Sequence, residues 1–158
     1  AKLAGARVIA TVGGAQKMQH ARDLGADEVI DYHAQDFAKE VRALTGKRGV
    51  DVVMEHIGAA TWEKSAACLA RKGRLATCGA TTGDTSSLNI WALFAKELEL
   101  IGSYGGTRAD LATVLTLVAA GKLKPVVHRE LPLESVAEAQ RLLEERSVFG
   151  KIVIDTTK

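Results

Sequence analysis

The chain has 158 residues, a length that fits one domain with a short appendage. With 47% hydrophobic and 25% charged residues, its composition is that of a globular protein able to build a core. The net charge of +2, with both signs mixed along the chain, gives no basic face for nucleic acid. No apolar run is long enough to span a membrane, and two cysteines are too few for a disulfide framework. We therefore expect a cytoplasmic protein.

Short apolar runs alternate with helical patterns over the first hundred residues. The runs typical of buried strands are 7–12, 29–30, 50–54, 74–78 and 98–103. Apolar residues at helical spacing occupy 16–24, 37–44, 62–69 and 88–94. This alternation predicts βαβ units with right-handed crossovers, and hence an α/β domain on a doubly wound parallel sheet.

The pattern changes after Gly105-Gly106. Leu111, Val114, Leu115 and Val118 mark a strong amphipathic helix that ends at Gly121, and extended segments surround Pro125 and Pro132. A second helical stretch and a final strand, 150–154, close the chain. We therefore expect two parts: residues 1–106 form the α/β domain and residues 107–158 a C-terminal helix-helix-strand tail.

Residues 1–5 have the pattern of a last helical turn capped by Gly5. In dinucleotide-binding domains a strand and a G-x-G-x-x-G loop precede such a helix, and no such motif exists in this chain. Gly13-Gly14 is only a pair, and it follows what would be the second strand. We expect a Rossmann-like sheet that lacks its first strand and glycine-rich loop, with a gap lined by unpaired backbone groups.

Six stretches of the sequence, through their order and the spacing between them, resemble one protein family. They are 4–13, 24–27, 49–53, 73–79, 121–126 and 149–153. Together they resemble the medium-chain dehydrogenase/reductase family, which includes zinc-type alcohol dehydrogenases and quinone oxidoreductases. The resemblance implies the NAD(P)-binding part of such an enzyme and a tail that packs on the catalytic domain. The ligands of any zinc and much of the substrate pocket would lie in an absent N-terminal part, so we expect this chain alone to be inactive.

The end of the strand 7–12 bears on the choice between NAD and NADP. Val12 stands where NAD-binding proteins place an acid for the ribose 2′-hydroxyl, and no acid follows before Asp23. A 2′-phosphate is therefore permitted, Lys17 offers it a positive charge, and Gly13 leaves room for the adenosine. Tyr32 is assigned to the same site by resemblance to quinone reductases. We expect NADPH to be preferred over NADH. The alternative for Lys17 is an exposed lysine in the first turn of a helix, and the alternative for Tyr32 is an aromatic residue at the rim of the site.

Ligands of open α/β sheets bind beyond the carboxyl ends of the strands. The resemblance implies that the loops after three later strands line the nicotinamide and its ribose. The residues expected there are His56, Ile57, Cys78, Gly79, Thr81, Ser103 and Tyr104. The alternatives are that the glycines are plain turn residues and that His56 is a structural hydrogen-bonding residue.

No catalytic or metal-binding set is recognisable. Cys78 has no partner base at recognisable spacing, so we interpret it as a buried structural thiol. Paired carboxylates, a Ser-His-Asp set and a metal cluster are also missing from the pattern. The site residues predicted from the sequence are therefore cofactor-binding residues alone.

The leading expectation is an NADPH-dependent oxidoreductase that transfers hydride to or from a small carbonyl, alcohol, quinone or enone. Three alternatives remain: a non-catalytic or crystallin-like nucleotide-binding member, an enoyl-reductase segment of a multi-domain synthase, and a methyltransferase-type domain with Glu55 as its strand-end acid. The edge strand 97–103 is apolar, and the resemblance implies that it pairs with its twofold mate in a homodimer.

Overall fold

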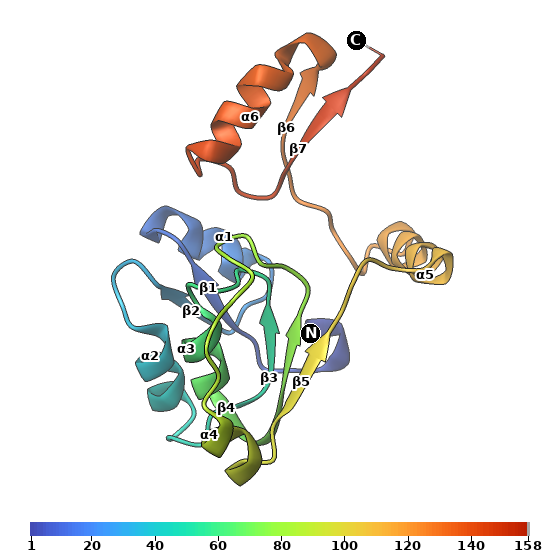
Figure 1. The fold of residues 1–158 in the computed structure, drawn as a ribbon. Helices are drawn as coiled ribbons and strands as arrows, with labels where there is room; N and C mark the ends of the chain where they lie inside the picture. Colours follow the sequence, from blue (N-terminus) through green and yellow to red (C-terminus); the bar gives the residue numbers. More distant parts are fainter. Residues whose placement is uncertain (158) are drawn as a thin grey trace. The chain divides into compact units, whose positions relative to one another are not determined.

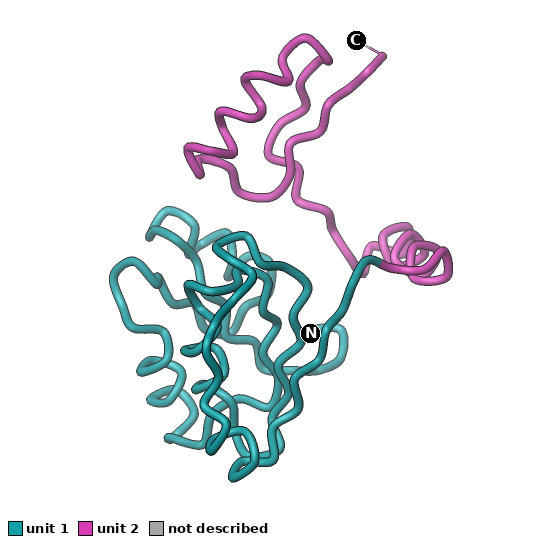
Figure 2. The backbone as a smooth tube through the Cα atoms, in the orientation of Figure 1, with its two compact units in different colours: residues 1–105 teal, residues 106–158 magenta. Residues whose placement is uncertain are grey.

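A computed structural model describes residues 1–157 of the chain (Figure 1). The chain forms two compact units, Ala1–Gly105 and Gly106–Lys158 (Figure 2). The boundary between them falls inside the Gly105-Gly106 pair at which the sequence pattern changes.

The first unit alternates strands with helices. Its strands are β1 (Ile9–Val12), β2 (Glu28–Asp31), β3 (Val50–Glu55), β4 (Leu69–Thr77) and β5 (Glu99–Gly102). Its α-helices are α1 (Met18–Asp23), α2 (Phe37–Leu44), α3 (Trp62–Ala67) and α4 (Ile90–Ala95), and short 3-10 turns occupy Lys2–Ala4 and Ala15–Lys17. All paired strands are parallel, which confirms the predicted α/β class.

The parallel strands of this unit form two separate ladders. β1 pairs with β2, with Val12 opposite Asp31, while β4 lies between β3 and β5. Within residues 1–157, no ladder joins β1 to β3. Val52 and Met54, on one face of β3, are 54% and 67% exposed. The sequence predicts an interruption of the sheet at this place, and the two separate ladders agree with that prediction.

A shared apolar core nevertheless links the two ladders. Ile30 from β2, Val41 from α2 and Cys68 form its buried centre, and Ile9 of β1 and Val53 of β3 pack against it. Helix α2 begins at Asp36, whose side chain accepts hydrogen bonds from the backbone N–H groups of Ala38 and Lys39. The core therefore holds β1 and β3 in one unit although no backbone hydrogen bonds connect them.

The structure corrects one boundary. The helical spacing of apolar residues predicts a helix through Leu69, but α3 ends at Ala67 and Leu69 begins β4, where it pairs with Val50. Leu69 is only 1% exposed. Because an apolar residue is buried equally well by a helix or by a central strand, spacing alone cannot separate the two.

The second unit contains α5 (Arg108–Ala119), β6 (Val127–Pro132), α6 (Val136–Glu144) and β7 (Lys151–Asp155), with a 3-10 turn at Leu133–Ser135. β6 and β7 pair in parallel and α6 connects them. The predicted helix-helix-strand tail is therefore a helix-strand-helix-strand unit, because the extended segment before Pro132 finds a partner in β7. In residues 1–157 no helix has both the length and the apolar character needed to cross a membrane.

Candidate functional site

Two glycines follow β1 and make close backbone contacts. A Cβ atom on Gly13 would lie 2.5 Å from the Tyr32 hydroxyl, so the phenol ring packs directly against this glycine. The backbone N–H of Tyr32 donates to the Val12 carbonyl at 3.1 Å, and its ring meets the His33 ring edge-on at 4.7 Å between centroids. Tyr32 therefore lies at the end of β1, as expected from the sequence. His33, which the sequence pattern leaves as a surface residue, is its neighbour.

Asp31, at the end of β2, binds the loop that contains Gly13 and Gly14. One carboxylate oxygen accepts from the backbone N–H groups of Gly14 and His33, each at 3.0 Å. The Gly14 hydrogen bond, together with that from His33, keeps the pKa of Asp31 below its ordinary value. An acid therefore stands beside the end of β1 in space, although none lies near Val12 along the chain. The carboxylate is engaged by the loop backbone, which leaves the cofactor preference open.

Lys17 lies two residues beyond this loop. It ends the 3-10 turn that leads into α1, and its side chain is half-buried. Gly14 adopts a φ of 105°, a conformation that favours glycine and turns the chain toward this helix. Gly13 and Tyr32 thus lie together at the carboxyl end of β1, and Lys17 follows in the turn that leads into α1.

The loops after β3 and β4 are joined to each other. The Ile57 carbonyl accepts from the Thr82 backbone N–H at 2.8 Å and from the Thr82 hydroxyl at 2.8 Å. The Ala59 N–H donates to the Gly83 carbonyl at 3.1 Å. A Cβ atom on Gly79 would lie 2.7 Å from the carbonyl oxygen of His56. The two strand ends therefore form one rigid layer of closely packed backbone.

A hollow of about 350 Å³ opens against this layer. Its lining residues are Gly58, Ala59, Trp62, Thr77, Gly79, Ala80, Gly83, Asp84, Thr85, Ser86 and Leu88. Most of them are small, so a flat ring can approach the backbone, and the hollow lies at the carboxyl ends of parallel strands. Of the predicted residues, only Gly79 lines it directly.

The remaining predicted residues lie around the same strand ends. Ile57 is half-buried between the loops, while His56 is exposed. The Thr81 hydroxyl donates to the Ile57 carbonyl at 3.3 Å. After β5, the Ser103 N–H donates to the Thr77 carbonyl at 2.8 Å, and Tyr104 is fully exposed. Tyr104 therefore contributes no packing to the layer.

The interpretation of Cys78 as a buried thiol is wrong. Cys78 is exposed, and it lies just beyond Thr77, the last residue of β4. The buried thiol is Cys68, and burial raises its pKa to about 11. Cys68 is therefore the inert core cysteine, and Cys78 lies in the candidate site.

Glu55 is a site residue that the sequence pattern only places at a strand end. Its side chain is 3% exposed and accepts hydrogen bonds from Ile57, Gly58, Thr61 and Ser65. Burial raises the pKa of Glu55, but these hydrogen bonds outweigh burial and keep the pKa below its ordinary value. The available signal was an acid directly after the apolar run Val52-Val53-Met54, at the end of a predicted strand.

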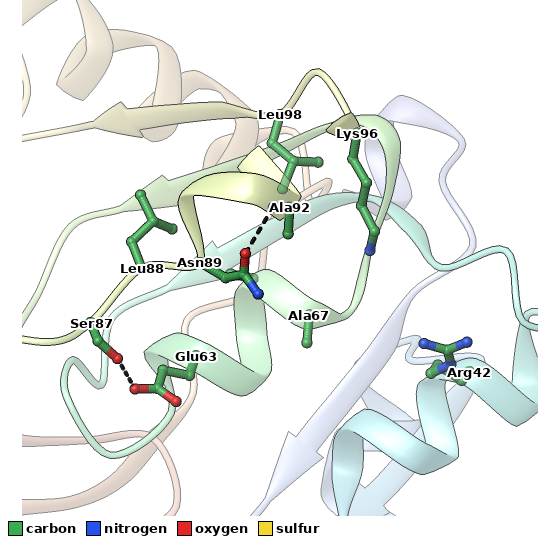
Figure 3. A pocket seen from close by; sticks show the side chains of 10 residues that line it. Arg42, Glu63, Ala67, Ser87, Leu88, Asn89, Ala92, Lys96 and Leu98 are labelled. Atoms are coloured by element: carbon green, nitrogen blue, oxygen red, sulfur yellow. Dashed lines mark hydrogen bonds between the residues drawn. The ribbon is translucent and has the colours of Figure 1, made fainter. Parts of the chain in front are cut away.

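A larger groove, of about 480 Å³, adjoins this hollow at Leu88. It runs between α3 and α4, with Arg42 and Lys96 on one side and the hydrogen-bonded pair Glu63–Ser87 on the other (Figure 3). Leu98, which precedes β5, places it near the amino ends of the strands. Because ligands of parallel sheets bind at the carboxyl ends, we do not assign the cofactor to this larger groove.

The comparison with protein families decides the identity of the fold. The family model described as "Zinc-binding dehydrogenase" matches residues 1–120. The chain belongs to this family. The match confirms the resemblance to the medium-chain dehydrogenase/reductase enzymes. In residues 1–157, no group of three or more His, Cys, Asp or Glu side chains suits a metal ion, so the described residues do not supply a zinc site.

Individual relatives agree with this assignment. Quinone oxidoreductase 1 of Escherichia coli (strain K12) is 33% identical over 98% of this chain and 50% of its own length. The crystal structure of an NAD-dependent alcohol dehydrogenase is 46% identical, with a TM-score of 0.91 over 98% of this chain and 45% of that one. A 2-octenoyl-CoA carboxylase reductase solved with NADP is 27% identical, with a TM-score of 0.88 over 97% of this chain and 38% of that one. The chain thus spans about half the length of the curated relatives it matches.

Proposed function

We propose that this chain is the cofactor-binding segment of an NADPH-dependent oxidoreductase. The reaction is hydride transfer to or from a small carbonyl, alcohol, quinone or enone. The observation that carries the proposal is the layer of close backbone contacts at the carboxyl ends of β3 and β4, beside a hollow that Gly79 and other small residues line. A second feature supports it: at the end of β1 the Tyr32 hydroxyl packs directly against Gly13.

The two halves of a dinucleotide fit the two groups of residues. We place the adenosine at the Gly13 loop, where a side chain would collide with Tyr32. We place the nicotinamide and its ribose at the layer that contains Ile57, Gly79 and Thr81. Both groups lie within the unit Ala1–Gly105. The bound cofactor supplies the hydride chemistry, while this chain's residues hold the cofactor in position and leave the face of its ring open to the substrate.

The preference for NADPH rests on charge near the end of β1. Lys17 brings a cation to the turn after the Gly13-Gly14 pair, and His33 lies beside Gly13. Asp31 lies beside the same loop, and one of its carboxylate oxygens accepts from two backbone N–H groups of that loop. In this proposal Lys17 and His33 receive the 2′-phosphate of NADPH.

We also propose that the enzyme is a homodimer. β5 ends the three-stranded ladder, and its outer edge has no partner strand in residues 1–157. Ile101 on this strand is 42% exposed. An apolar edge of this kind is satisfied when the same strand of a second copy pairs with it.

The experiment is a substrate panel with the full-length protein. The loss of NADPH absorbance would be followed with a quinone, an enone and an aldehyde, and alcohol oxidation with NADP⁺. We expect turnover with at least one of these classes. NADPH binding without turnover would favour the non-catalytic, crystallin-like alternative, and no binding of either dinucleotide would contradict the proposal.

A further inference from the structure

Glu55 is a buried carboxylate that pairs with no charged side chain among residues 1–157. Its side chain is 3% exposed at the carboxyl end of β3. The groups that donate to it are the N–H groups of Ile57 and Gly58 and the hydroxyls of Thr61 and Ser65, all of them neutral. An ionised carboxylate removed from water needs such donors, because an uncompensated buried charge is strongly unfavourable.

The two oxygens of this carboxylate face different elements. Oε1 accepts from the Ile57 N–H at 2.7 Å and from the Gly58 N–H at 3.3 Å. Oε2 accepts from the Ser65 hydroxyl at 2.5 Å, and the Thr61 hydroxyl reaches both oxygens, at 3.1 Å and 3.0 Å. Oε1 therefore organises the loop after β3, whereas Oε2 anchors helix α3.

The loop that Oε1 organises also fixes the neighbouring loop. The Ile57 carbonyl holds the N–H and the hydroxyl of Thr82. Gly58 has a φ of 95° and approaches the Gly83 carbonyl so closely that a Cβ atom would lie 2.6 Å from it. Gly58 and Gly83 both line the hollow of about 350 Å³. A shift of the peptide after Glu55 would therefore move both walls of this hollow.

We propose that Glu55 is a positioning residue for the cofactor, acting through its Oε1 hydrogen bonds to Ile57 and Gly58. It touches no substrate or cofactor itself. The inference rests on the proposed function, because it takes the hollow as the nicotinamide site. If the carboxylate instead only anchored α3 to β3, its loss would lower stability and leave cofactor affinity unchanged.

The test compares two variants with a matched control in the full-length protein. Glu55→Leu fills the space but removes both acceptors, while Glu55→Gln retains an acceptor oxygen for the loop. The control Ser65→Ala removes only the hydrogen bond from α3 to Oε2. For each protein the measurements are the Kd for NADPH, the separate kcat and KM values, and hydrogen exchange at the Ile57 and Gly58 amides.

We expect Glu55→Leu to raise the Kd for NADPH about tenfold, since hydrogen bonds to a charged group are lost. Its KM for NADPH rises more than its kcat falls, and the two loop amides exchange faster. Glu55→Gln recovers most of the affinity. Ser65→Ala lowers stability but leaves the Kd and the exchange of these amides within about twofold. A folded Glu55→Leu with wild-type Kd, or a Ser65→Ala effect as large as that of Glu55→Leu, would overturn the inference.

If Glu55→Leu does not fold, Glu55→Gln decides. A rise of about two- to fivefold in Kd with faster exchange at both amides supports the positioning role, because a neutral acceptor bonds more weakly. Unchanged affinity and exchange contradict it. The exchange measurement needs no cofactor, so it separates the two claims: wild-type protein that binds no dinucleotide refutes the proposed function, while unaltered amide exchange in Glu55→Gln refutes the role of Glu55.

Discussion

The carboxylate of Asp31 accepts a hydrogen bond from the backbone N–H of Gly14 at 3.0 Å. Asp31 ends β2 and Gly14 follows β1, so this contact connects two strand ends that lie 17 residues apart in the sequence. The same oxygen accepts from the His33 N–H at 3.0 Å. Asp31 therefore shapes the loop at which we place the adenosine ribose.

Replacement of Asp31 by alanine should weaken cofactor binding. The Gly14 and His33 N–H groups lose their acceptor, the loop becomes less ordered, and we expect the Kd for NADPH to rise about tenfold. Isothermal titration calorimetry measures the change. Asp23→Ala is the matched control, because Asp23 is exposed on α1 and its carboxylate accepts from the Gln19 side chain on the same helix. Equal Kd values for the two variants would show that Asp31 does not shape the site.

Gly58 should tolerate no side chain. An alanine there is strained at a φ of 95° and would bring its Cβ within 2.6 Å of the Gly83 carbonyl and 2.8 Å of the Ala80 Cα. We expect a loss of roughly 1–3 kcal/mol in the free energy of unfolding and a loss of NADPH binding. Urea unfolding and an NADPH titration provide the two readouts.

Gly46 supplies the control for that substitution. Its φ of 57° is also positive, but a Cβ atom on it would meet nothing within 4 Å. Gly46→Ala should cost about 1 kcal/mol from backbone conformation alone and leave binding intact. Similar behaviour of the two alanine variants would mean that the contact between the two loops is unimportant.

Acid should remove a stabilising contribution of Glu55. Its folded-state pKa lies below the ordinary value, because hydrogen bonds outweigh the opposing effect of burial. The contribution is therefore complete above the unfolded-state pKa of about 4.3 and is lost as the pH falls through the lower folded-state pKa. Urea unfolding across this range should show a shallower pH dependence for Glu55→Gln than for the wild type. Parallel curves would contradict the assignment.

Charge on the β5 edge should dissociate the proposed dimer. In an Ile101→Lys variant, the lysine of one copy would face the same lysine of the second copy. Because the two cations repel each other, we expect a monomer by analytical ultracentrifugation. Leu24→Lys, at a position 52% exposed after α1, should leave the dimer intact. A wild-type protein that sediments as a strict monomer would refute the interface.

The alternation of elements was predictable because strand and helix periods differ and glycines separate the segments. The interruption between β1 and β3 was also predictable, because no G-x-G-x-x-G motif with its preceding strand occurs in these 158 residues. The boundary at Leu69 was not, because burial in a helix and in a central strand select the same residue type. The exposure of Cys78 was missed because its place one residue past a strand is invisible in an apolar pattern.

The candidate site was only partly predictable. The glycines were proposed from their positions at strand ends, and Tyr32 from the resemblance to quinone reductases. The roles of Asp31 and Glu55 do not, because each depends on contacts made in space: Asp31 with Gly14 across two strands, and Glu55 with the donors of α3 and its own loop. A single sequence shows where an acid stands but not which backbone N–H groups it will face.

The most direct test of the cofactor assignment uses the adenosine half alone. The affinity of the protein for 2′,5′-ADP and for 5′-AMP would be measured by calorimetry, in the wild type and in Lys17→Ala. We predict tighter binding of 2′,5′-ADP to the wild type, and a loss of about tenfold in Lys17→Ala with 5′-AMP unchanged, because only the 2′-phosphate meets the lysine. Equal affinity of the wild type for both nucleotides, or a Lys17→Ala variant with both affinities unaltered, would contradict the assignment.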